Sequence, residues 1–470
     1  MHVSVPLKVY NEIMTKIKSV VAIGASKVAT WGLRKMGRGG TNLPGRIAKR
    51  IDPQVLASFA KSLTVIVVTG TNGKTTTTRM IEQILKDQNI KYFTNKSGAN
   101  LQTGIIATFA EHCSVSGASE YTHALLECDE AAFRQVSEYL EVDYLVVNNI
   151  FRDQLDRYGE ITHTLNAIRS GVKKQANTTL ILNADCSLTS SLADDAPAKV
   201  LYFGIDKKIY KRSVKEISDA EYCIKCRTKY EYDYKTFAHL GAFSCPNCGY
   251  KKHNTDWTVT KIIKSDLDCS EIEVKSDKKK WKVKLNLPGA YNIYNAAASL
   301  ALADVIDLNI EKAIKSLNNF EVGFGRTEKL ALKKTEARMM LVKNPTGFNQ
   351  VINYLINTKS KCNLMFVLND RIADGTDISW IWDVDFETLA NDMKRFKKIY
   401  VSGIRKYDMA LRLKAAGFDM KKIVIEEDNE KLVDELLGVK DPVFIMPTYT
   451  AMFEIRKALQ DKLNLKEFYE

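Results

Sequence analysis

The sequence contains no apolar run long enough to span a bilayer and no signal peptide at its start. These absences predict a cytoplasmic protein. Histidine is scarce, with 6 residues among 470, and no cysteine lies in a glycine-flanked elbow of the kind that presents a catalytic nucleophile. Nine cysteines without a secretory signal predict thiols or metal ligands instead of disulfides.

Basic residues outnumber acidic ones, 69 Lys and Arg against 56 Asp and Glu, which gives a net charge of +13. Such an excess favours an anionic partner, whether a nucleotide, a nucleic acid or an anionic membrane surface, and does not choose among them. A length of 470 residues with 45% hydrophobic residues predicts a globular protein of roughly three domains.

The strongest motif lies at residues 65–77 and reads Val-Ile-Val-Val-Thr-Gly-Thr-Asn-Gly-Lys-Thr-Thr-Thr. The β-branched run at residues 64–68 predicts a buried strand, and apolar residues at helical spacing over residues 76–87 predict a helix. A glycine loop between strand and helix places backbone N–H groups around an anion, with Lys74 on the β/γ-phosphates and Thr75 on Mg²⁺. The alternative is a tight turn with a chance lysine. The expected nucleotide-binding residues of the loop are Gly70, Thr71, Asn72, Gly73, Lys74, Thr75 and Thr76.

The loop is a short form, because Val68 occupies the place of the first glycine in the usual phosphate-loop spacing. This short form resembles the Mur ligase family, which forms peptide bonds on cell-wall precursors through acyl phosphates, and its relative folylpolyglutamate synthase. The resemblance implies ATP and Mg²⁺ as cofactors and Lys74 as a catalytic residue.

Further strands are predicted at residues 123–127, 142–149 and 179–183, and a strand at 200–204 is expected to close the sheet. The resemblance implies that Glu127, at the end of its strand, is a catalytic Mg²⁺ ligand. For the next two acids, Asp129 and Glu130, the alternative to a role at the metal is that they are solvated caps of the following helix. Segment 149–156 is similar to the Mur motif Asn-x-x-x-Asp-His-Leu-Asp, with Gln154 in place of the histidine, and Asn183 to Asp185 matches the motif that follows.

Two Cys-x₂-Cys pairs, separated by eighteen residues, predict a closed tetrahedral zinc site of structural type. The expected ligands are Cys223, Cys226, Cys245 and Cys248. Ordinary Mur ligases lack such an insert. Within the Mur-like proteins it resembles the MurT family, whose members work with the glutaminase GatD to amidate the D-glutamate of lipid II.

Three more segments resemble Mur motifs near the nucleotide. Residues 289–295 match Gly-x-His-Asn-x-x-Asn with Tyr291 in place of the histidine, and the resemblance implies that Asn292 lies near the nucleotide. The alternative is a core helix with asparagines as caps. Arg326 matches the arginine of the motif Gly-Arg-x-Glu, and Lys343 occupies a histidine position, with a solvated surface lysine as the alternative.

From residue 337 onward, strands and helices alternate, which predicts a doubly wound α/β domain with its first strand at 339–342 and a helix at 386–396. Segment 368–385 holds five aspartates and two tryptophans after a strand end. The MurT resemblance implies that a GatD-like glutaminase docks here and that one aspartate, Asp374 or next Asp377, assists its catalytic histidine. A polar loop with the tryptophans capping the core is the alternative.

The expected fold is therefore an α/β, Mur-ligase-like P-loop domain at residues 55–328, with a zinc-ribbon insertion at about 219–255 and a C-terminal α/β domain at 329–470. Residues 1–54 form a basic helical lead segment. Its part 16–36 could rest on a membrane surface as an amphipathic helix, although helical periodicity alone favours packing on the domain.

The resemblance implies an ATP-dependent amidation of the D-glutamate α-carboxylate of lipid II, at the inner face of the membrane, with ammonia from a GatD-like partner and no nucleic acid. The absence of a nucleophile elbow agrees with a separate glutaminase. An amino-acid-adding Mur or folylpolyglutamate ligase is the alternative, and a zinc-ribbon, P-loop nucleic-acid-binding protein is a more distant one.

Overall fold

The computed structural model describes most of the chain, with short gaps. The described ranges are 7–36, 42–59, 63–95, 98–152, 161–196, 198–209, 214–215, 219–265, 269–277, 279–287, 289–321, 328–358 and 360–463. Within these ranges, no helix is both long and apolar enough to cross a bilayer.

A nine-stranded sheet forms the larger unit, in the order β11-β10-β9-β6-β5-β4-β1-β3-β2. The strands from β2 to β6 run parallel to their neighbours. Their buried runs of Val, Ile and Leu are typical of a sheet covered on both faces. The bounds of these strands are β1 Thr64–Thr69, β2 Tyr92–Thr94, β3 His123–Glu127, β4 Tyr144–Val147, β5 Thr179–Asn183 and β6 Val200–Ile205.

The prediction that the strand at 200–204 closes the sheet is wrong. Strand β9 (Trp257–Ser265) pairs in parallel with β6, and β10 (Ser270–Ser276) and β11 (Lys279–Leu285) extend it as antiparallel strands. In β10 every second residue is buried and the others are more exposed. This alternating pattern belongs to a half-buried antiparallel strand, so the apolar runs that marked the parallel strands are missing.

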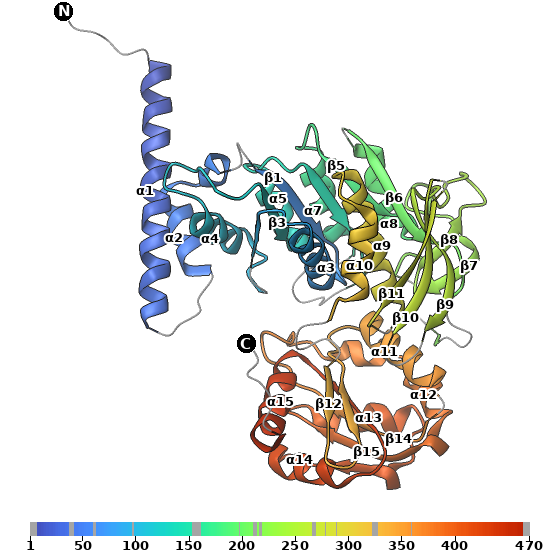
Figure 1. The fold of residues 1–470 in the computed structure, drawn as a ribbon. Coiled ribbons are helices and arrows are strands. Elements are labelled where there is room, and N and C mark those ends of the chain that lie inside the picture. Colours follow the sequence, from blue (N-terminus) through green and yellow to red (C-terminus); the bar gives the residue numbers. More distant parts are fainter. Residues whose placement is uncertain are drawn as a thin grey trace, which may run out of the picture.

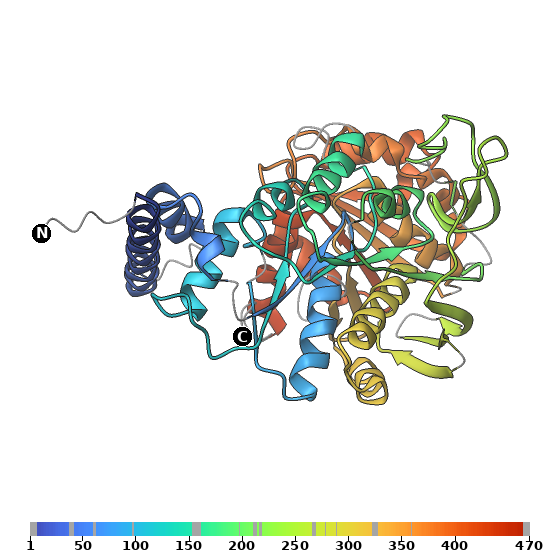
Figure 2. The same cartoon turned by 90° about the horizontal axis from the view of Figure 1, so that it is seen from above.

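Helices cover both faces of this sheet, as the view from above shows (Figure 2). Helix α3 (Lys74–Asp87) packs against α9 (Ala290–Val305) and α10 (Ile310–Asn318), and α5 (Glu130–Val136) packs against α7 (Ile161–Val172). The hairpin of β7 (Glu231–Phe237) and β8 (Leu240–Ser244) lies in the insertion between β6 and β9. Helix α8 (Ser187–Ser190) follows β5.

A six-stranded sheet forms the second unit, below the first in Figure 1, in the order β12-β13-β17-β14-β15-β16. All neighbours pair in parallel except β12 and β13, so the prediction of a doubly wound α/β unit is confirmed. Its strands are β12 Glu328–Ala331, β13 Glu336–Met339, β14 Cys362–Val367, β15 Phe396–Ser402, β16 Ile423–Ile425 and β17 Val443–Pro447. Its helices are α11 Pro345–Asn357, α12 Phe386–Ala390, α13 Lys406–Ala415, α14 Asn429–Gly438 and α15 Tyr449–Leu463.

Two predicted bounds in this unit are wrong. The sequence predicted the first strand at residues 339–342, but β13 spans Glu336–Met339. These earlier residues are the ones that pair with β12 on one side and with β17 on the other. Helix α12 stops at Ala390, and Phe396 already begins β15.

Two helices precede the first sheet. Helix α1 (Leu7–Lys35) is long and stands at one side of the molecule, against α2 (Asn42–Ile51) and α4 (Gln102–His112) (Figure 1). The short helix η1 (Val55–Ser58) also contacts it. This segment therefore packs on the rest of the protein along one face of α1, as its helical periodicity favoured.

Candidate functional site

The loop between β1 and α3 is built around two glycines with positive φ. Gly70 has φ 120° and Gly73, at the N-terminus of α3, has φ 87°. A Cβ added at Gly73 would lie 2.2 Å from Oδ1 of Asn295, and one at Gly70 would lie 2.8 Å from the carbonyl oxygen of Asn149. Both the backbone conformation and the close neighbours therefore require glycine at these positions.

Asn149, at the end of the neighbouring strand β4, holds the loop in place. Its Oδ1 accepts a hydrogen bond from the N–H of Asn72 at 2.9 Å, and its Nδ2 donates to the carbonyl oxygen of Asn72 at 3.1 Å. The N–H of Thr71 donates to the carbonyl of Asn149 at 3.0 Å. This bonding fixes the shape of the loop and so the position of the N-terminus of α3, whose backbone N–H groups are of the kind that hold an anion.

Lys74 lies in the first turn of α3, and its side chain folds back over the loop. Its Nζ donates to the carbonyl oxygen of Gly70 at 2.7 Å and forms an ion pair with Oε1 of Glu130 at 3.0 Å. Burial by itself disfavours the charged lysine, but the carboxylates of Glu130, Glu127 and Asp129 outweigh burial and raise the pKa of Lys74. The side chain is therefore a fixed positive charge beside the loop.

The two acids after Glu127 are not solvated caps. Asp129 is the N-cap of α5 and accepts from the N–H groups of Ala131 and Ala132, but it is only 6% exposed. Glu130 is 5% exposed and pairs with Lys74. The sequence did not single out Glu130 as a partner of the lysine, since their contact joins residues 56 positions apart.

Glu127 is the last residue of β3 and pairs in register with Val68 of β1. It is buried, its N–H is held by Oδ1 of Asn95, and Nδ2 of Asn100 approaches its Oε1 at 3.5 Å. The neighbouring strand β1 leads through the loop to Thr75, the second residue of α3. A carboxylate and a hydroxyl at one edge of a parallel sheet are oxygen ligands of the type that Mg²⁺ prefers.

Asn292 and Asn295 lie on the first turns of α9, directly beside the loop. Both are buried, and Nδ2 of Asn295 donates to Oδ1 of Asn292 at 3.2 Å. Their position next to Gly73 places the start of α9 at the phosphate loop. Arg326, Asp153, Gln154 and Asp156 lie outside the described residues.

A buried polar cluster behind the loop was not predicted. The carboxylate of Asp185 pairs with Nζ of Lys252 at 2.8 Å and accepts from the hydroxyl of Tyr294 at 2.5 Å. Burial is the largest effect on Asp185 and raises its pKa, although Lys252 opposes this. The cluster ties β5, the cysteine insertion and α9 together, and the sequence signal for it was the motif at 183–185.

The second unit reaches the loop through Asn344. Its Nδ2 donates to Oδ1 of Asn72 at 3.3 Å, and its Oδ1 caps α11 by accepting from the N–H of Gly347. Lys343, the preceding residue, is half-buried. A second connection runs through Arg152, which pairs with Asp219 at 3.3 Å and with Asp383 of the second unit at 3.4 Å.

The four predicted zinc ligands come together in one cluster. All four Sγ atoms lie within 4.8 Å of one another, with 3.5 Å between those of Cys223 and Cys248 and 3.4 Å between those of Cys226 and Cys245. A tetrahedral ion with Zn–S bonds of about 2.3 Å would separate its sulfurs by roughly 3.8 Å. The cluster therefore fits a four-coordinate metal ion.

Asp374 of the aspartate-rich segment is buried, with 3% of its surface exposed. Its carboxylate accepts from the N–H and the hydroxyl of Thr450, at 2.7 and 2.5 Å, near the N-terminus of α15. Asp377 is exposed and lies in a pocket of about 320 Å³. Two exposed apolar side chains, Trp382 and Leu411, line the same pocket. Further exposed apolar side chains lie close to its lining residues in the sequence: Ile372, Ile404 and Tyr407.

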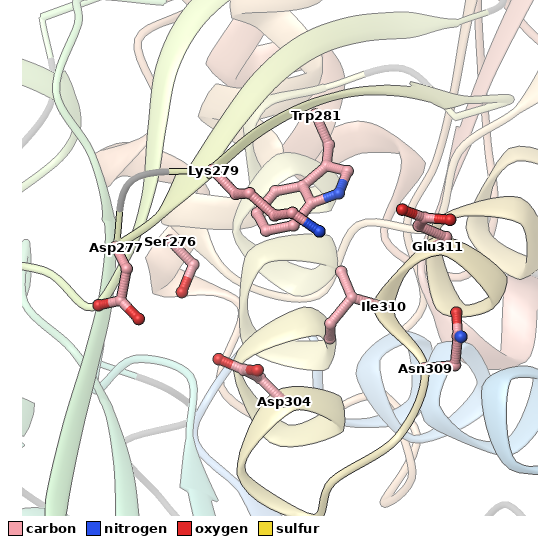
Figure 3. Close-up of a pocket in the computed structure, with 8 residues that line it drawn as sticks. All are labelled: Ser276, Asp277, Lys279, Trp281, Asp304, Asn309, Ile310 and Glu311. Carbon is pink, nitrogen blue, oxygen red and sulfur yellow. The ribbon is translucent and has the colours of Figure 1, made fainter.

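A pocket of about 880 Å³ lies away from the loop, between the β10–β11 hairpin and the junction of α9 with α10 (Figure 3). Asp304, which lines it, is near the C-terminal end of α9, whereas Asn295 is near the N-terminal end. Nine residues of helix separate these two positions by about 14 Å. The pocket is therefore separate from the phosphate loop.

Family models match two parts of the chain. The Mur ligase middle domain matches residues 68–248, and the MurT ligase C-terminal model matches residues 341–452. The first contains the phosphate loop and the four cysteines, and the second contains Lys343 and Asp374.

Similar solved structures support the fold. A pseudomurein peptide ligase type C from Methanothermus fervidus has a TM-score of 0.64 at 20% identity, over 87% of this chain and 81% of that one. MurF from Acinetobacter baumannii has a TM-score of 0.63 at 14% identity, over 89% and 81%. At these identities the likeness concerns the fold alone, and it confirms the predicted Mur-ligase-like architecture.

Closer relatives are subunits named MurT of lipid II isoglutaminyl synthase (glutamine-hydrolyzing). The protein from Streptococcus pneumoniae is 34% identical over 95% of this chain and 98% of its own length, and that from Staphylococcus aureus strain N315 is 30% identical over 92% and 95%. Since this identity extends over both units and nearly the full length of each relative, the chain belongs to the family of MurT subunits of lipid II isoglutaminyl synthase.

Proposed function

We propose that this chain is the ATP-dependent subunit of a lipid II isoglutaminyl synthase and amidates the α-carboxylate of D-glutamate in the lipid II stem peptide. The observation that carries the proposal is the phosphate loop with Lys74 and Glu130, in a chain that a MurT relative matches over 95% of its length. MgATP would transfer its γ-phosphoryl group to the carboxylate, and ammonia would displace the phosphate from the acyl phosphate to leave an amide.

The residues of the loop would position ATP. The N–H groups at the start of α3, residues 73–75, would hold the phosphates, and Lys74 would neutralise charge on them, a role in which placement and charge do most of the catalysis. Mg²⁺ would be held by Thr75 and Glu127. Asn292, Lys343 and Arg326 are proposed to contact the nucleotide, with Asn344 bringing the second unit to the loop.

The cysteine cluster is proposed to hold Zn²⁺ with a structural role. Four thiolates leave no open coordination position for a substrate or water. The zinc site would instead hold the hairpin β7–β8 beside Asp185 and α9.

The partner is proposed to be a GatD-like glutaminase that docks on the second unit around Asp377. The exposed apolar side chains there, Trp382, Tyr407 and Leu411 among them, are typical of a protein interface. Asp374 is proposed to assist the glutaminase by orienting its catalytic histidine, which requires the buried carboxylate to be uncovered or reached in the complex.

The test is an assay of the chain alone with ATP, Mg²⁺, lipid II and ammonium. Release of ADP and conversion of a stem-peptide carboxyl to a carboxamide, measured by mass analysis, are expected. Lys74→Ala should abolish both, whereas Lys86→Ala, an exposed lysine of the same helix, should leave both unchanged. Coupling of an added amino acid in place of ammonia would instead show an ordinary peptide ligase.

A further inference from the structure

Helix α1 has one face packed on the protein. Ser19, Ala22, Ile23 and Ser26 are buried there, with Ser19 Oγ donating to Asp52 at 2.6 Å. These four residues share one side of a helix with 3.6 residues per turn. Because α1 is anchored along this face, its opposite side is presented to the surroundings without any rearrangement.

The opposite side of α1 carries large apolar side chains that the described residues leave uncovered. We call it the outer face of α1. Between 36% and 67% of each of these side chains is exposed: Met14, Ile17, Val20, Val21, Val28 and Trp31. On a helical projection they fall within an arc of about 120°, centred opposite the buried face.

Basic residues border the outer face and no acidic residue lies within it. Residues 13–36 contain five Lys or Arg and no Asp or Glu. Arg34 pairs with Glu111 of α4, and Nζ of Lys35 lies 4.3 Å from the ring centre of Trp31. The face therefore combines apolar side chains, an indole ring and positive charge, the combination that helices use at an anionic lipid surface.

We propose that the outer face of α1 docks on an anionic lipid bilayer and lies in its interfacial plane. Insertion would be shallow, to about 5–10 Å, since α1 is not apolar enough to span the membrane. A second copy of the chain suits the face less well, because it would oppose two rows of lysines. The docking stands on α1 alone and does not rest on the proposed reaction, but it would hold the chain at the surface that carries a lipid-linked substrate.

The test is co-sedimentation of the full chain with phosphatidylglycerol vesicles and with phosphatidylcholine vesicles, without nucleotide or lipid II. Binding to the first and not the second is expected, with a blue shift in fluorescence that Trp31→Phe removes. The double variant Ile17→Glu, Val28→Glu should reduce the bound fraction at least about tenfold, because two apolar side chains that would enter the lipid become charges that the anionic surface repels.

A matched control carries the same charge change elsewhere. Ile263→Glu, Met420→Glu replaces two apolar residues that are 41% and 40% exposed on β9 and near β16, and should bind as the unaltered chain does. Unchanged thermal melting of both double variants shows that they fold. Equal binding of the α1 variant and the unaltered chain, or no binding of the latter, overturns the proposal.

A second experiment, sedimentation velocity of the same proteins without vesicles, tests a second copy of the chain as the other occupant of the face. If the unaltered chain dimerises in sedimentation velocity and the α1 variant does not, the face is covered by a second copy and the lipid proposal falls. Failure of the amidation assay leaves the vesicle result intact, so the two proposals fail separately.

Discussion

Gly73 is the residue at which the phosphate loop has least room. A methyl group there would meet Oδ1 of Asn295 at 2.2 Å, whereas Gly98, with nearly the same φ of 85°, has nothing within 4 Å of its added Cβ. Both alanine variants carry the conformational cost of a left-handed residue, about 1–2 kcal/mol. We predict that Gly73→Ala weakens ATP binding at least about tenfold in calorimetric titration.

Gly98→Ala is the control for that prediction. It should melt at a temperature close to that of Gly73→Ala and bind ATP as the unaltered chain does. Equal ATP affinity of the two variants would show that the contact with Asn295 has no role in shaping the loop.

Asp374 gives a second prediction at the residue scale. We expect Asp374→Asn to lower glutamine-dependent amidation by at least about a hundredfold in the presence of the partner, since a neutral amide does not stabilise a charged histidine. Amidation with free ammonium should persist, because the Asp374 carboxylate accepts its hydrogen bonds from Arg371 and Thr450 of the second unit.

Asp377→Asn separates the two aspartates. The Asp377→Asn variant should retain glutamine-dependent activity. If instead Asp377→Asn loses this activity and Asp374→Asn retains it, Asp377 is the residue that assists the glutaminase. If both variants are fully active with glutamine, neither aspartate assists the partner.

Single residues also show where sequence reasoning succeeds and where it stops. The placement of Lys74 and Thr75 followed from a local order of strand, loop and helix, which needs no distant contact. The pairing of Lys74 with Glu130 and the hydrogen bond from Asn344 to Asn72 join distant segments, so local pattern did not reveal them.

At the scale of elements, the cysteine cluster connects β7 and β8 to the body. We predict one zinc per chain by atomic emission, and loss of the metal in Cys245→Ser. If the site contributes roughly 3 kcal/mol or more, the melting temperature should fall by about 6–12 °C. Cys269→Ser, a buried cysteine outside the cluster, should retain the zinc.

A metal content of zero with an unchanged melting temperature would contradict a structural zinc site. Loss of ADP release without loss of stability in Cys245→Ser would point to a catalytic metal instead.

The strands that are buried on both faces were the ones that the sequence predicted correctly. Strands β1, β3 and β5 are apolar runs and were predicted to within a residue. Strands β10 and β11 alternate between buried and exposed residues and carry many lysines, so the apolar-run criterion passed over them. The four cysteines were found from their spacing alone, since a tetrahedral site imposes that spacing.

At the scale of the whole molecule, the two sheet units meet at the phosphate loop through Asn344. We predict that Asn344→Ala raises the KM for ATP several-fold, because it removes the contact of the second unit with Asn72 of the phosphate loop. It also removes the cap of α11, which costs about 1 kcal/mol of stability.

Asn309→Ala is a matched control, since Asn309 caps α10 in the same manner, through the N–H of Lys312, without touching the loop. It should lose a similar amount of stability and keep the KM for ATP. Equal KM values for the two variants would separate the second unit from nucleotide binding.

The most direct test of the proposed reaction follows the oxygen atoms of the substrate. Lipid II carrying heavy oxygen in its D-glutamate α-carboxylate would be incubated with the chain, MgATP and ammonium, and the released phosphate analysed by mass. Amidation through an acyl phosphate predicts one heavy oxygen in phosphate for each amide formed. Amide formed with phosphate free of the label would contradict the proposed activation of the carboxylate by ATP.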